Sequence, residues 1–318
     1  MGKISRPRRG SLQFWPRKRA KKILPSANWQ AILKNNSDKK LLGFIGYKVG
    51  MLSAYVKDLT NDSMTKNKRI SVPVTILECP PIKILSARFY RYGEVVSDVL
   101  AHNLDKELIS KIKLPLKHNK KIEDIKDYDD VKVIVYSIVK KTGIKKVPDI
   151  AEIALGGNIE SKIAFVKENL GKEMLVGEAF QNMQLIDIHG VTKGHGLEGA
   201  VNRFGLSLKQ HKSEKGRRRP GSLGPWHPAR VTFRAPMAGQ KGLFSRLVYN
   251  SKIISISNIN SKNINPSGGF TNFGVVKSDY IVLYGSVPGP QKRQLLITQP
   301  LRATRKQSKK NYELIELR

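Results

Sequence analysis

Cysteine and acidic residues are what this 318-residue sequence has least of. Its one cysteine, Cys79, excludes a disulfide framework and any thiolate metal cage that the chain would build alone. Only 25 Asp and Glu stand against 58 Lys and Arg, so the formal net charge is +33. A compact chain with that charge repels itself unless an anion compensates it, and phosphate is the usual one. The composition therefore favours a phosphate-bearing partner.

Long apolar runs are also missing. No stretch of 18 or more apolar residues occurs, which excludes a transmembrane helix. The N-terminus is polybasic and lacks the apolar centre of a secretory signal. We therefore expect no membrane partner and a cytoplasmic protein. At 40% hydrophobic residues, the chain still has enough apolar side chains to bury a core.

The positive charge is confined to three regions. Residues 1–22 hold nine Lys and Arg and no acid, residues 189–246 hold twelve and two acids, and residues 280–312 hold seven and no acid. Residues 98–178 differ, since fifteen basic residues there face fourteen acids. Three separate basic regions in one chain favour nucleic-acid binding over a merely solvated surface.

Residues 1–37 predict an extended basic arm. Proline and glycine interrupt any helix there, and no apolar periodicity is present. Its arginines suit phosphate, while Phe14, Trp15 and Trp29 could stack or dock. Alone in water the arm should be disordered.

The body of the chain reads as mainly β. Stretches with strand-like patterns are 41–56 (with a tight bend at its glycines), 70–78, 82–91, 183–188, 253–259, 280–287 and 295–298. These stretches lie on both sides of the segments 94–179 and 205–245. The simplest fold is therefore a β-barrel or sandwich interrupted by insertions. We assign the body to 38–93 and 180–318.

Residues 94–179 predict an inserted α/β module. Residues 132–139 alternate as a strand does, and apolar residues at helical spacing predict a helix over 159–170 that Gly171 would stop. Residues 147–155 are a candidate for another short helix.

Residues 205–245 predict an extended basic loop within the body. They contain many glycines and prolines and little amphipathic pattern, and the stretch 215–278 has no Asp or Glu. A stretch of this length without core-forming residues is either functional or disordered. Aromatic residues among arginines suit contact with folded nucleic acid, since Arg binds phosphate through two N–H groups and stacks on bases.

No motif in the sequence predicts catalysis, a metal site or a cofactor. Residues 194–199 match G-x-G-x-x-G, but Gly205 ends the helix that should follow, and Arg217–Arg219 stand where a dinucleotide site needs an acid. The six histidines form no paired ligand set. Cys79 follows an apolar strand and predicts a buried, inert thiol.

The stretch Gly224–Pro228 predicts a stiff loop that carries Trp226. Prolines on both sides of the Trp-His pair restrict its backbone and discourage a helix. The indole could stack on a base or sugar, or it could pack in the protein's own core. The neighbouring residues are polar and interrupted by glycine and proline, which favours stacking on a base or sugar.

Six stretches resemble the universal ribosomal large-subunit protein L-three family in its archaeal/eukaryotic form. They are RPRRGSL at 6–12, GFIGYKVGM at 43–51, GVTKGHG at 190–196, RRRPGSLGPWHPAR at 217–230, AGQKG at 238–242 and PSGGF at 266–270. They follow the family's order and span nearly the whole chain.

The resemblance implies a translation-protein-type β-barrel with an inserted α/β module. It implies partners in large-subunit ribosomal RNA and other large-subunit proteins, a role early in subunit assembly, and a location in the cytoplasmic ribosome. It also implies that the basic loop extends toward the peptidyl-transferase centre, with Trp226 as the tip tryptophan and His211 as the family's loop histidine.

The candidate RNA-binding residues come from the first two basic regions. They are Arg6, Arg8, Arg9, Arg17, Lys18, Arg19, Lys193, His195, Arg203, His211, Lys212, Arg217, Arg218, Arg219, Trp226, His227, Arg230, Arg234, Gln240, Lys241 and Arg246. No catalytic residue, metal, cofactor or small-molecule substrate is expected. Two rival classes remain: an oxidoreductase using the 194–199 glycines, and a polybasic protein that binds DNA or a membrane surface.

Overall fold

The structure is a computed structural model that describes residues 10–36, 41–115, 120–212 and 215–318. These residues form two compact units. The small unit combines residues from 1–21 with 192–245, and the large unit combines 22–191 with 246–318. Each unit therefore joins segments that are distant in the sequence.

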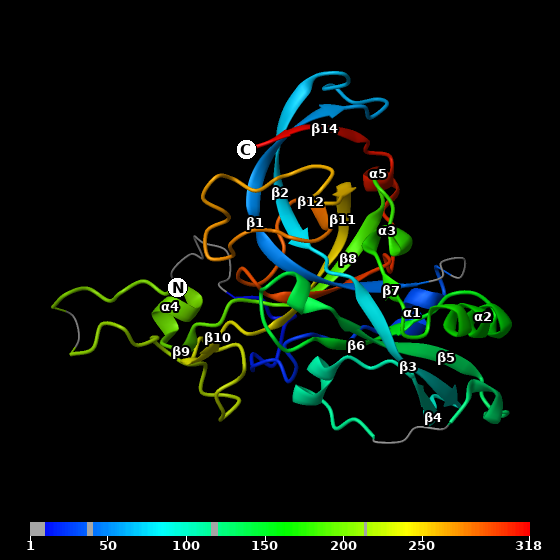
Figure 1. The fold of residues 1–318 in the computed structure, drawn as a ribbon. Helices are drawn as coiled ribbons and strands as arrows, with labels where there is room; N and C mark the ends of the chain where they lie inside the picture. Colours follow the sequence, from blue (N-terminus) through cyan, green and yellow to red (C-terminus); the bar gives the residue numbers. More distant parts are fainter. Residues whose placement is uncertain (1–9, 37–40, 116–119, 213–214) are drawn as a thin grey trace. The chain divides into compact units, whose positions relative to one another are not determined.

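Seven strands of the large unit form one sheet. They are β1 Gly43–Asp58, β2 Arg69–Glu78, β8 Leu185–Val191, β11 Ser245–Ser257, β12 Tyr280–Tyr284, β13 Gln294–Thr298 and β14 Tyr312–Leu317. Their order is β13-β8-β11-β12-β2-β1-β14, and β13 also pairs with β1. That last pairing returns to the start, so six strands form a ring of hydrogen-bonded neighbours (Figure 1). A barrel requires strand neighbours in such a ring. The strand content confirms the predicted mainly β class.

Strand β1 connects three neighbours. It pairs with β2 along most of its length, with β13 near its start and with β14 near its end. The tight bend expected within 41–56 is wrong: the chain continues as one 16-residue strand. A register shift between Lys48 and Gly50 takes the place of the turn. A bulge of this kind bends a strand without ending its pairing.

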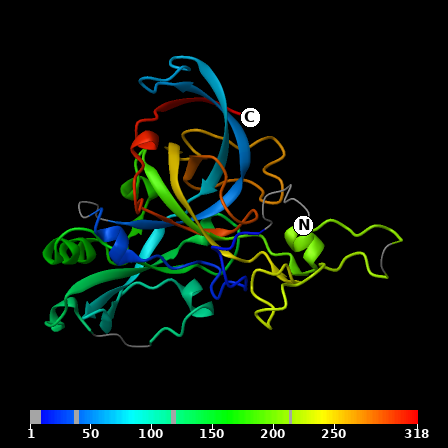
Figure 2. The ribbon, with the colours of Figure 1, turned by 180° about the vertical axis from the view of Figure 1, so that it is seen from behind.

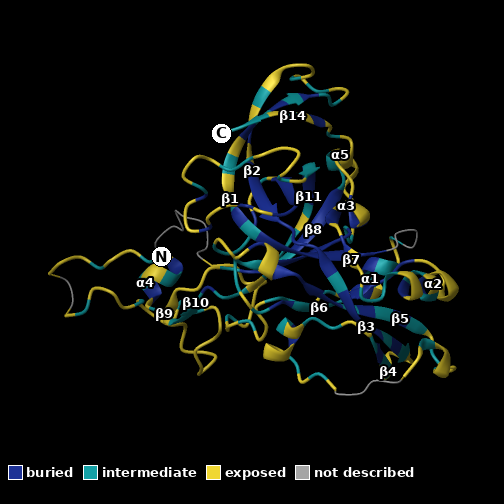
Figure 3. Cartoon of the chain, in the orientation of Figure 1, coloured by how far each residue is buried: buried dark blue, intermediate teal, exposed yellow. Residues whose placement is uncertain are grey.

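The core of the large unit lies inside the ring and continues under a second sheet. Phe44, Ile45 and Tyr47 of β1 are fully buried, and Figure 3 shows the strands mostly in the buried colour. The Tyr47 hydroxyl donates to Oδ2 of the buried Asp149 at 2.6 Å. Cys79 is fully buried, as predicted, and burial raises the pKa of its thiol.

The second sheet of the large unit has the order β4-β3-β5-β6, with β7 also paired to β3. Its strands are β3 Ile82–Arg91, β4 Glu94–Leu100, β5 Asp130–Ser137, β6 Ile150–Ala154 and β7 Glu173–Met174. The sequence assigned β3 to the body. It pairs instead with β4 and β5, so the inserted sheet begins at Ile82.

Short helices accompany this sheet (Figure 2). They are α2 Ile159–Asn169 and the 3-10 turns Lys106–Ser110, Ile122–Asp124 and Val139–Lys141. Helix α3 Val176–Ala179 contacts β1 of the seven-stranded sheet instead. The helix predicted over 159–170 is confirmed, and Gly171 follows it with a φ of 78°. The helix considered for 147–155 is wrong, because β6 pairs there with β5 and its residues Ile153 and Ala154 are buried.

The predicted arm is not extended throughout its described part. Helix α1 spans Trp29–Leu33, and its N-cap Asn28 accepts a hydrogen bond from the backbone of Ala31. Trp29 and Ile32 are buried in the core of the large unit. The burial of two apolar side chains on one helical face, together with the Asn28 cap, stabilises this helix despite the surrounding positive charge. Of the two roles considered for Trp29, docking is the observed one.

Candidate nucleic-acid interface

The small unit holds most of the predicted RNA-binding residues. Arg6, Arg8 and Arg9 lie outside the described residues, and Arg246 belongs to the large unit, where burial lowers the pKa of its guanidinium. In the small unit, the exposed candidates are Lys18, Arg19, Lys193, His195, His211, Lys212, Arg217, Arg218, Arg219, Trp226, His227, Arg230 and Arg234. The half-buried candidates are Arg17, Arg203, Gln240 and Lys241.

Phe204 is the centre of the small unit. It ends helix α4 Ala200–Phe204, where Gly205 adopts the left-handed conformation with a φ of 66°. The ring is buried, and the guanidinium carbons of Arg17 and Arg203 lie 5.1 and 5.2 Å from its centroid. Burial lowers the pKa of Arg203, and the charge of Arg17 lowers it further. Two guanidinium groups beside one ring create a site where an added anion is favourable.

Arg203 also fixes the base of the basic loop. Its Nε donates to the carbonyl of Gln240 at 3.0 Å, and a terminal nitrogen donates to the carbonyl of Met237 at 2.9 Å. Lys241 Nζ donates to the carbonyl of Asn202 at 2.8 Å. Three of the predicted RNA-binding residues, Arg203, Gln240 and Lys241, therefore have positioning contacts within the protein. RNA contact by these residues stays a prediction.

The two glycine-rich stretches of the small unit meet in a close backbone crossing. Strand β9 Gly196–Glu198 pairs antiparallel with β10 Gly239–Lys241. Gly242 has a φ of 75°, and a Cβ there would lie 1.9 Å from the carbonyl oxygen of Lys193. A side chain at 242 would thus separate the two stretches. Gly242 therefore serves this crossing.

The geometry also excludes a dinucleotide-binding unit at residues 194–199. Of these glycines only Gly196 lies in a strand, β9, which pairs antiparallel with one partner in a two-stranded sheet. The helix that follows has five residues, whereas such a unit needs a long helix packed on a parallel sheet.

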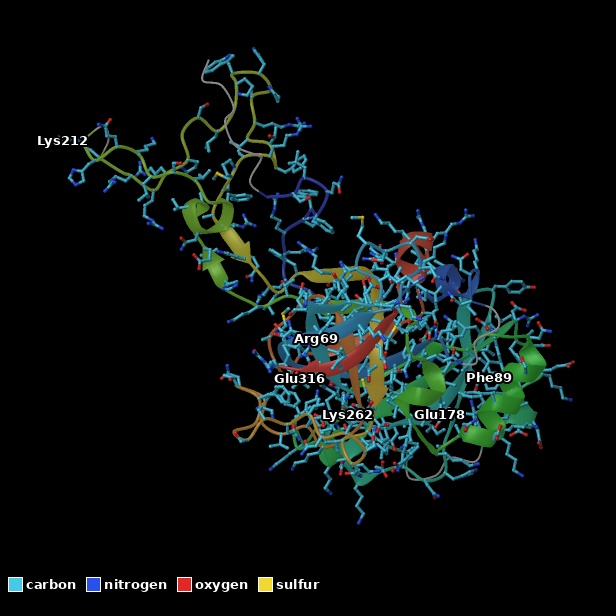
Figure 4. The ribbon with its side chains drawn as sticks, turned by 90° about the horizontal axis from the view of Figure 1, so that it is seen from above. Arg69, Phe89, Glu178, Lys212, Lys262 and Glu316 are labelled. Atoms are coloured by element: carbon cyan, nitrogen blue, oxygen red, sulfur yellow. The ribbon has the colours of Figure 1, made fainter. Side chains whose placement is uncertain are left out.

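The loop from Gly205 to Pro236 exposes most of its side chains (Figure 3). Trp226 is 88% exposed, so it lies outside the protein's own core. It lines an open hollow with Pro225, Pro228 and Arg230. Figure 4 labels Lys212 at a turn of the same loop. An exposed indole beside a guanidinium suits stacking on a base.

An aromatic contact that the sequence did not reveal joins the arm to the loop within the small unit. The rings of Trp15 and Phe233 lie 5.3 Å apart, tilted by 52°. The guanidinium carbon of Arg234 lies 5.9 Å from the centre of the Phe233 ring. Trp15 and Phe233 remain 58% and 45% exposed. The sequence showed an aromatic residue in each segment but could not pair them.

The charge of the small unit is not balanced from within. Residues 10–21 and 192–245 contain fifteen Lys and Arg but only two acids, Glu198 and Glu214. Glu198 accepts a hydrogen bond from Asn202 at 2.8 Å. Two carboxylates cannot neutralise fifteen cations, so a positive net charge remains on the unit.

Other kinds of site find little support in the described part of the chain. No helix there is long and apolar enough to cross a membrane. No group of three or more His, Cys, Asp and Glu there could hold a metal ion. Exposed arginine, lysine and aromatic side chains on a poorly packed loop define a nucleic-acid-binding protein.

Comparison with known proteins identifies the family. The model of the family "Ribosomal protein L3" matches residues 1–318. Large ribosomal subunit protein uL3 of Methanocaldococcus jannaschii is 41% identical over 314 residues, covering 94% of this chain and 92% of the relative. The uL3 proteins of Picrophilus torridus and Methanobrevibacter smithii are each 40% identical over 94% of this chain and cover 92% and 93% of those relatives. The chain belongs to the ribosomal protein L3 family.

Family membership settles the broad role. The chain is a structural constituent of the large ribosomal subunit rather than a catalyst, and rRNA binding is typical of the family. Its partners are ribosomal RNA and other ribosomal proteins, in the ribosome of the cytoplasm. The resemblance seen in the sequence is confirmed.

Proposed function

We propose that this chain supports assembly of the large subunit and that its basic loop, residues 205–245, carries Trp226 toward the peptidyl-transferase centre. One observation carries the proposal. Trp226 is 88% exposed on a loop whose neighbouring arginines have no acid between positions 215 and 278. An indole costs free energy in water, and it is retained at a surface where a partner covers it.

The exposed cations of the loop are proposed to contact RNA phosphates. Arg218, Arg219 and Arg230 are exposed, and each guanidinium can bind a phosphate through two N–H groups. Such contacts follow the shape of folded RNA rather than its base sequence. Trp226 and His227 add flat surfaces for bases or sugars.

The loop is proposed to gain order when RNA neutralises it. Few of its described amides have backbone partners; Lys209 with Arg217 and Arg230 with Pro228 are two that do. RNA then supplies the counter-charge that lets the segment pack between RNA helices. If about 10–20 phosphates are contacted, the log–log slope of affinity against salt is about −7 to −18.

The loop positions RNA and performs no proton transfer of its own in this proposal. Between 215 and 245 it offers arginine, lysine, a tryptophan and a histidine but no carboxylate. Such side chains hold RNA in place near the reaction centre. Assembly is supported in the same way, because the cations allow negatively charged RNA segments to approach one another.

The test replaces Trp226 by Ala and uses Met64→Ala as a control. Met64 is 95% exposed in the turn between β1 and β2, so both changes remove a large exposed apolar side chain. We expect the free energies of unfolding of both free variant chains to lie within about 0.5 kcal/mol of the wild-type value. Large subunits carrying Trp226→Ala should react more slowly with puromycin, and those carrying Met64→Ala should match wild type.

Two results would contradict the proposal. A clear loss of stability in the free Trp226→Ala chain would show that the indole belongs to the protein's own core. Subunits that form in normal yield and react at the wild-type rate would show that the loop has no role at the reaction centre.

A further inference from the structure

The third basic region of the sequence provides none of the contacts proposed above. Within it, residues 302–310 connect β13 to β14 in the large unit and include the short helix α5 Arg305–Ser308. We call residues 302–310 the basic hook. The hook contains five cations among nine residues, namely Arg302, Arg305, Lys306, Lys309 and Lys310.

Buried and backbone groups of the large unit fix both ends of the hook. Before it, the buried Asp187 accepts hydrogen bonds from the backbone N–H groups of Leu301 at 2.9 Å and Asn250 at 2.7 Å. After it, the backbone N–H of Asn311 donates to the Thr60 hydroxyl at 3.0 Å. The hook is therefore attached to two separate strands of the ring and to the turn after β1.

A buried lysine fixes the middle of the hook. Lys252 of β11 is 5% exposed, and its Nζ donates to the carbonyl oxygens of Gln307 at 3.3 Å and Ser308 at 3.1 Å. Asn250 Nδ2 donates to the Thr304 hydroxyl at 3.0 Å. Figures 1 and 2 show α5 close to β11 in both views. These contacts use backbone and neutral groups of the hook and leave its cations directed elsewhere.

The cations of the hook have no acidic partner in the described part of the chain. Arg302, Arg305, Lys306 and Lys309 are exposed, and Lys310 Nζ lies 5.8 Å from the centre of the Tyr284 ring. None of the five forms an ion pair with a described acid. Like charges four residues apart, such as those of Arg305 and Lys309, repel each other.

A nearby pair shows that charge on this unit can be balanced internally. Arg69 of β2 contacts Glu316 of β14 at 2.9 Å, and Figure 4 labels both residues. Strand β14 follows directly after the hook in the chain. Glu316 is therefore already paired, whereas the five cations of the hook form no ion pair with a described acid.

We propose that the basic hook is a preformed binding surface for the phosphodiester backbone of ribosomal RNA, separate from the basic loop. The inference rests on the proposed RNA-binding function of the chain. Protein interfaces centre on aromatic and apolar side chains, and the hook has none larger than Ala303. Phosphates require only charge and spacing. Because its backbone is already fixed, the hook binds without the ordering cost that the loop incurs.

The test compares two triple variants of the full-length chain that lose the same charge. Arg305→Gln, Lys306→Gln and Lys309→Gln alter the hook. Lys106→Gln, Lys111→Gln and Lys113→Gln alter exposed lysines of the inserted module, where acids balance the charge. Binding to transcribed large-subunit ribosomal RNA is measured at several KCl concentrations, and thermal melting checks that both variants fold.

We expect the hook variant to lower the steepness of the log–log salt slope by about 2–3, because each lost phosphate contact removes about one. The control variant should keep the slope of wild type. Equal slopes for hook variant and control, with a steep wild-type slope, would overturn the hook proposal and leave the loop proposal intact. A wild-type slope near zero would overturn both.

A second measurement separates RNA from an acidic protein as the partner. A photo-reactive benzoylphenylalanine in place of Ala303, which is exposed within the hook, is incorporated into assembled large subunits. Crosslinks to ribosomal RNA are expected. Crosslinks to a ribosomal protein alone would show that the hook is a protein interface and would overturn the proposal.

Discussion

The two units of this chain use their charged residues in different ways. In the large unit, Arg88 donates to Asp98 at 2.8 Å and contacts Glu152 at 3.3 Å. The half-buried Asp130 pairs with the buried Lys162 at 2.6 Å. In the small unit, Arg203 donates to backbone carbonyl groups and lies beside another arginine. Arg17 and Arg203 are thus held by backbone carbonyl groups that do not neutralise their charge.

The difference shows what each unit depends on for its conformation. The large unit buries three apolar clusters and pairs most of the charges of its second sheet, so burial and ion pairs define it. The small unit has one buried phenylalanine ring, a two-stranded sheet and a close glycine crossing. Its geometry depends on backbone contacts, and its charge depends on a partner.

The strongest test of this contrast compares one phenylalanine in each unit. Phe44 is fully buried in the large unit, so Phe44→Ala should lower the free energy of unfolding by about 3–5 kcal/mol. Phe233 is 45% exposed in the small unit, and Phe233→Ala should cost less than about 1 kcal/mol. Denaturant titration of both variants measures this. Similar losses would mean that the small unit has a core of its own.

The second expected effect is a pH dependence of the large unit. Burial lowers the pKa of His189 to about 4. Between about pH 4 and 6.5 the unfolded chain therefore binds a proton that the folded chain does not. The stabilisation is complete above pH 6.5 and is lost as the pH falls toward 4, by up to about 3 kcal/mol.

The variant His189→Gln isolates this effect. Burial raises the pKa of the Glu78 and Asp187 carboxyl groups, and raised carboxyl pKa values act in the opposite direction. We measure the unfolding free energy of wild type and variant from pH 7 to 4 and take the difference. The contributions of the carboxyl groups cancel in this difference, because both chains contain them. Parallel pH profiles would rule out His189 as the titrating group.

The third expected effect is confined to the small unit. Gly242→Ala places a Cβ 1.9 Å from the Lys193 carbonyl oxygen at a positive φ, which should cost about 1–3 kcal/mol locally. Amide exchange at His195 and Leu243, whose N–H groups bond across this crossing, should accelerate. Gly221→Ala is the control, because a Cβ there meets no atom within 4 Å. Unchanged exchange in Gly242→Ala would show that the crossing is not rigid.

The smallest expected effect concerns the stability of the loop cations. Replacing Arg218, Arg219 and Arg230 together by Gln should change the unfolding free energy of the free chain by less than about 0.5 kcal/mol, because all three are exposed. The same variant should lower the steepness of the RNA salt slope by about 2–3. A clear destabilisation would place these side chains in the protein's own packing.

Strand positions were predictable where burial on one face leaves a pattern in the sequence. The pattern identified β2, β12 and β13 and helix α2. It failed for β6, whose Ile150–Ala154 is too short to separate a strand from a helix by periodicity. It also failed for β3, since a strand's sequence does not say which sheet it joins.

The candidate interface was predictable as a segment but not as a geometry. Charge and the missing acids marked the basic loop. The contact of Arg17 with Phe204 and that of Trp15 with Phe233 join residues about two hundred positions apart. No short-range sequence pattern predicts such long-range contacts. The positioning roles of Arg203 and Lys241 were hidden for the same reason, because their partners are backbone carbonyls.

Amide hydrogen exchange of residues 205–236 of the basic loop, in the free chain and in the assembled large subunit, measures whether RNA orders the loop. Residues 43–58 of β1 provide the internal reference. We expect fast exchange of the loop in the free chain, strong protection of the loop in the subunit, and protection of β1 in both. A loop that is as protected in the free chain as in the subunit would contradict this expectation.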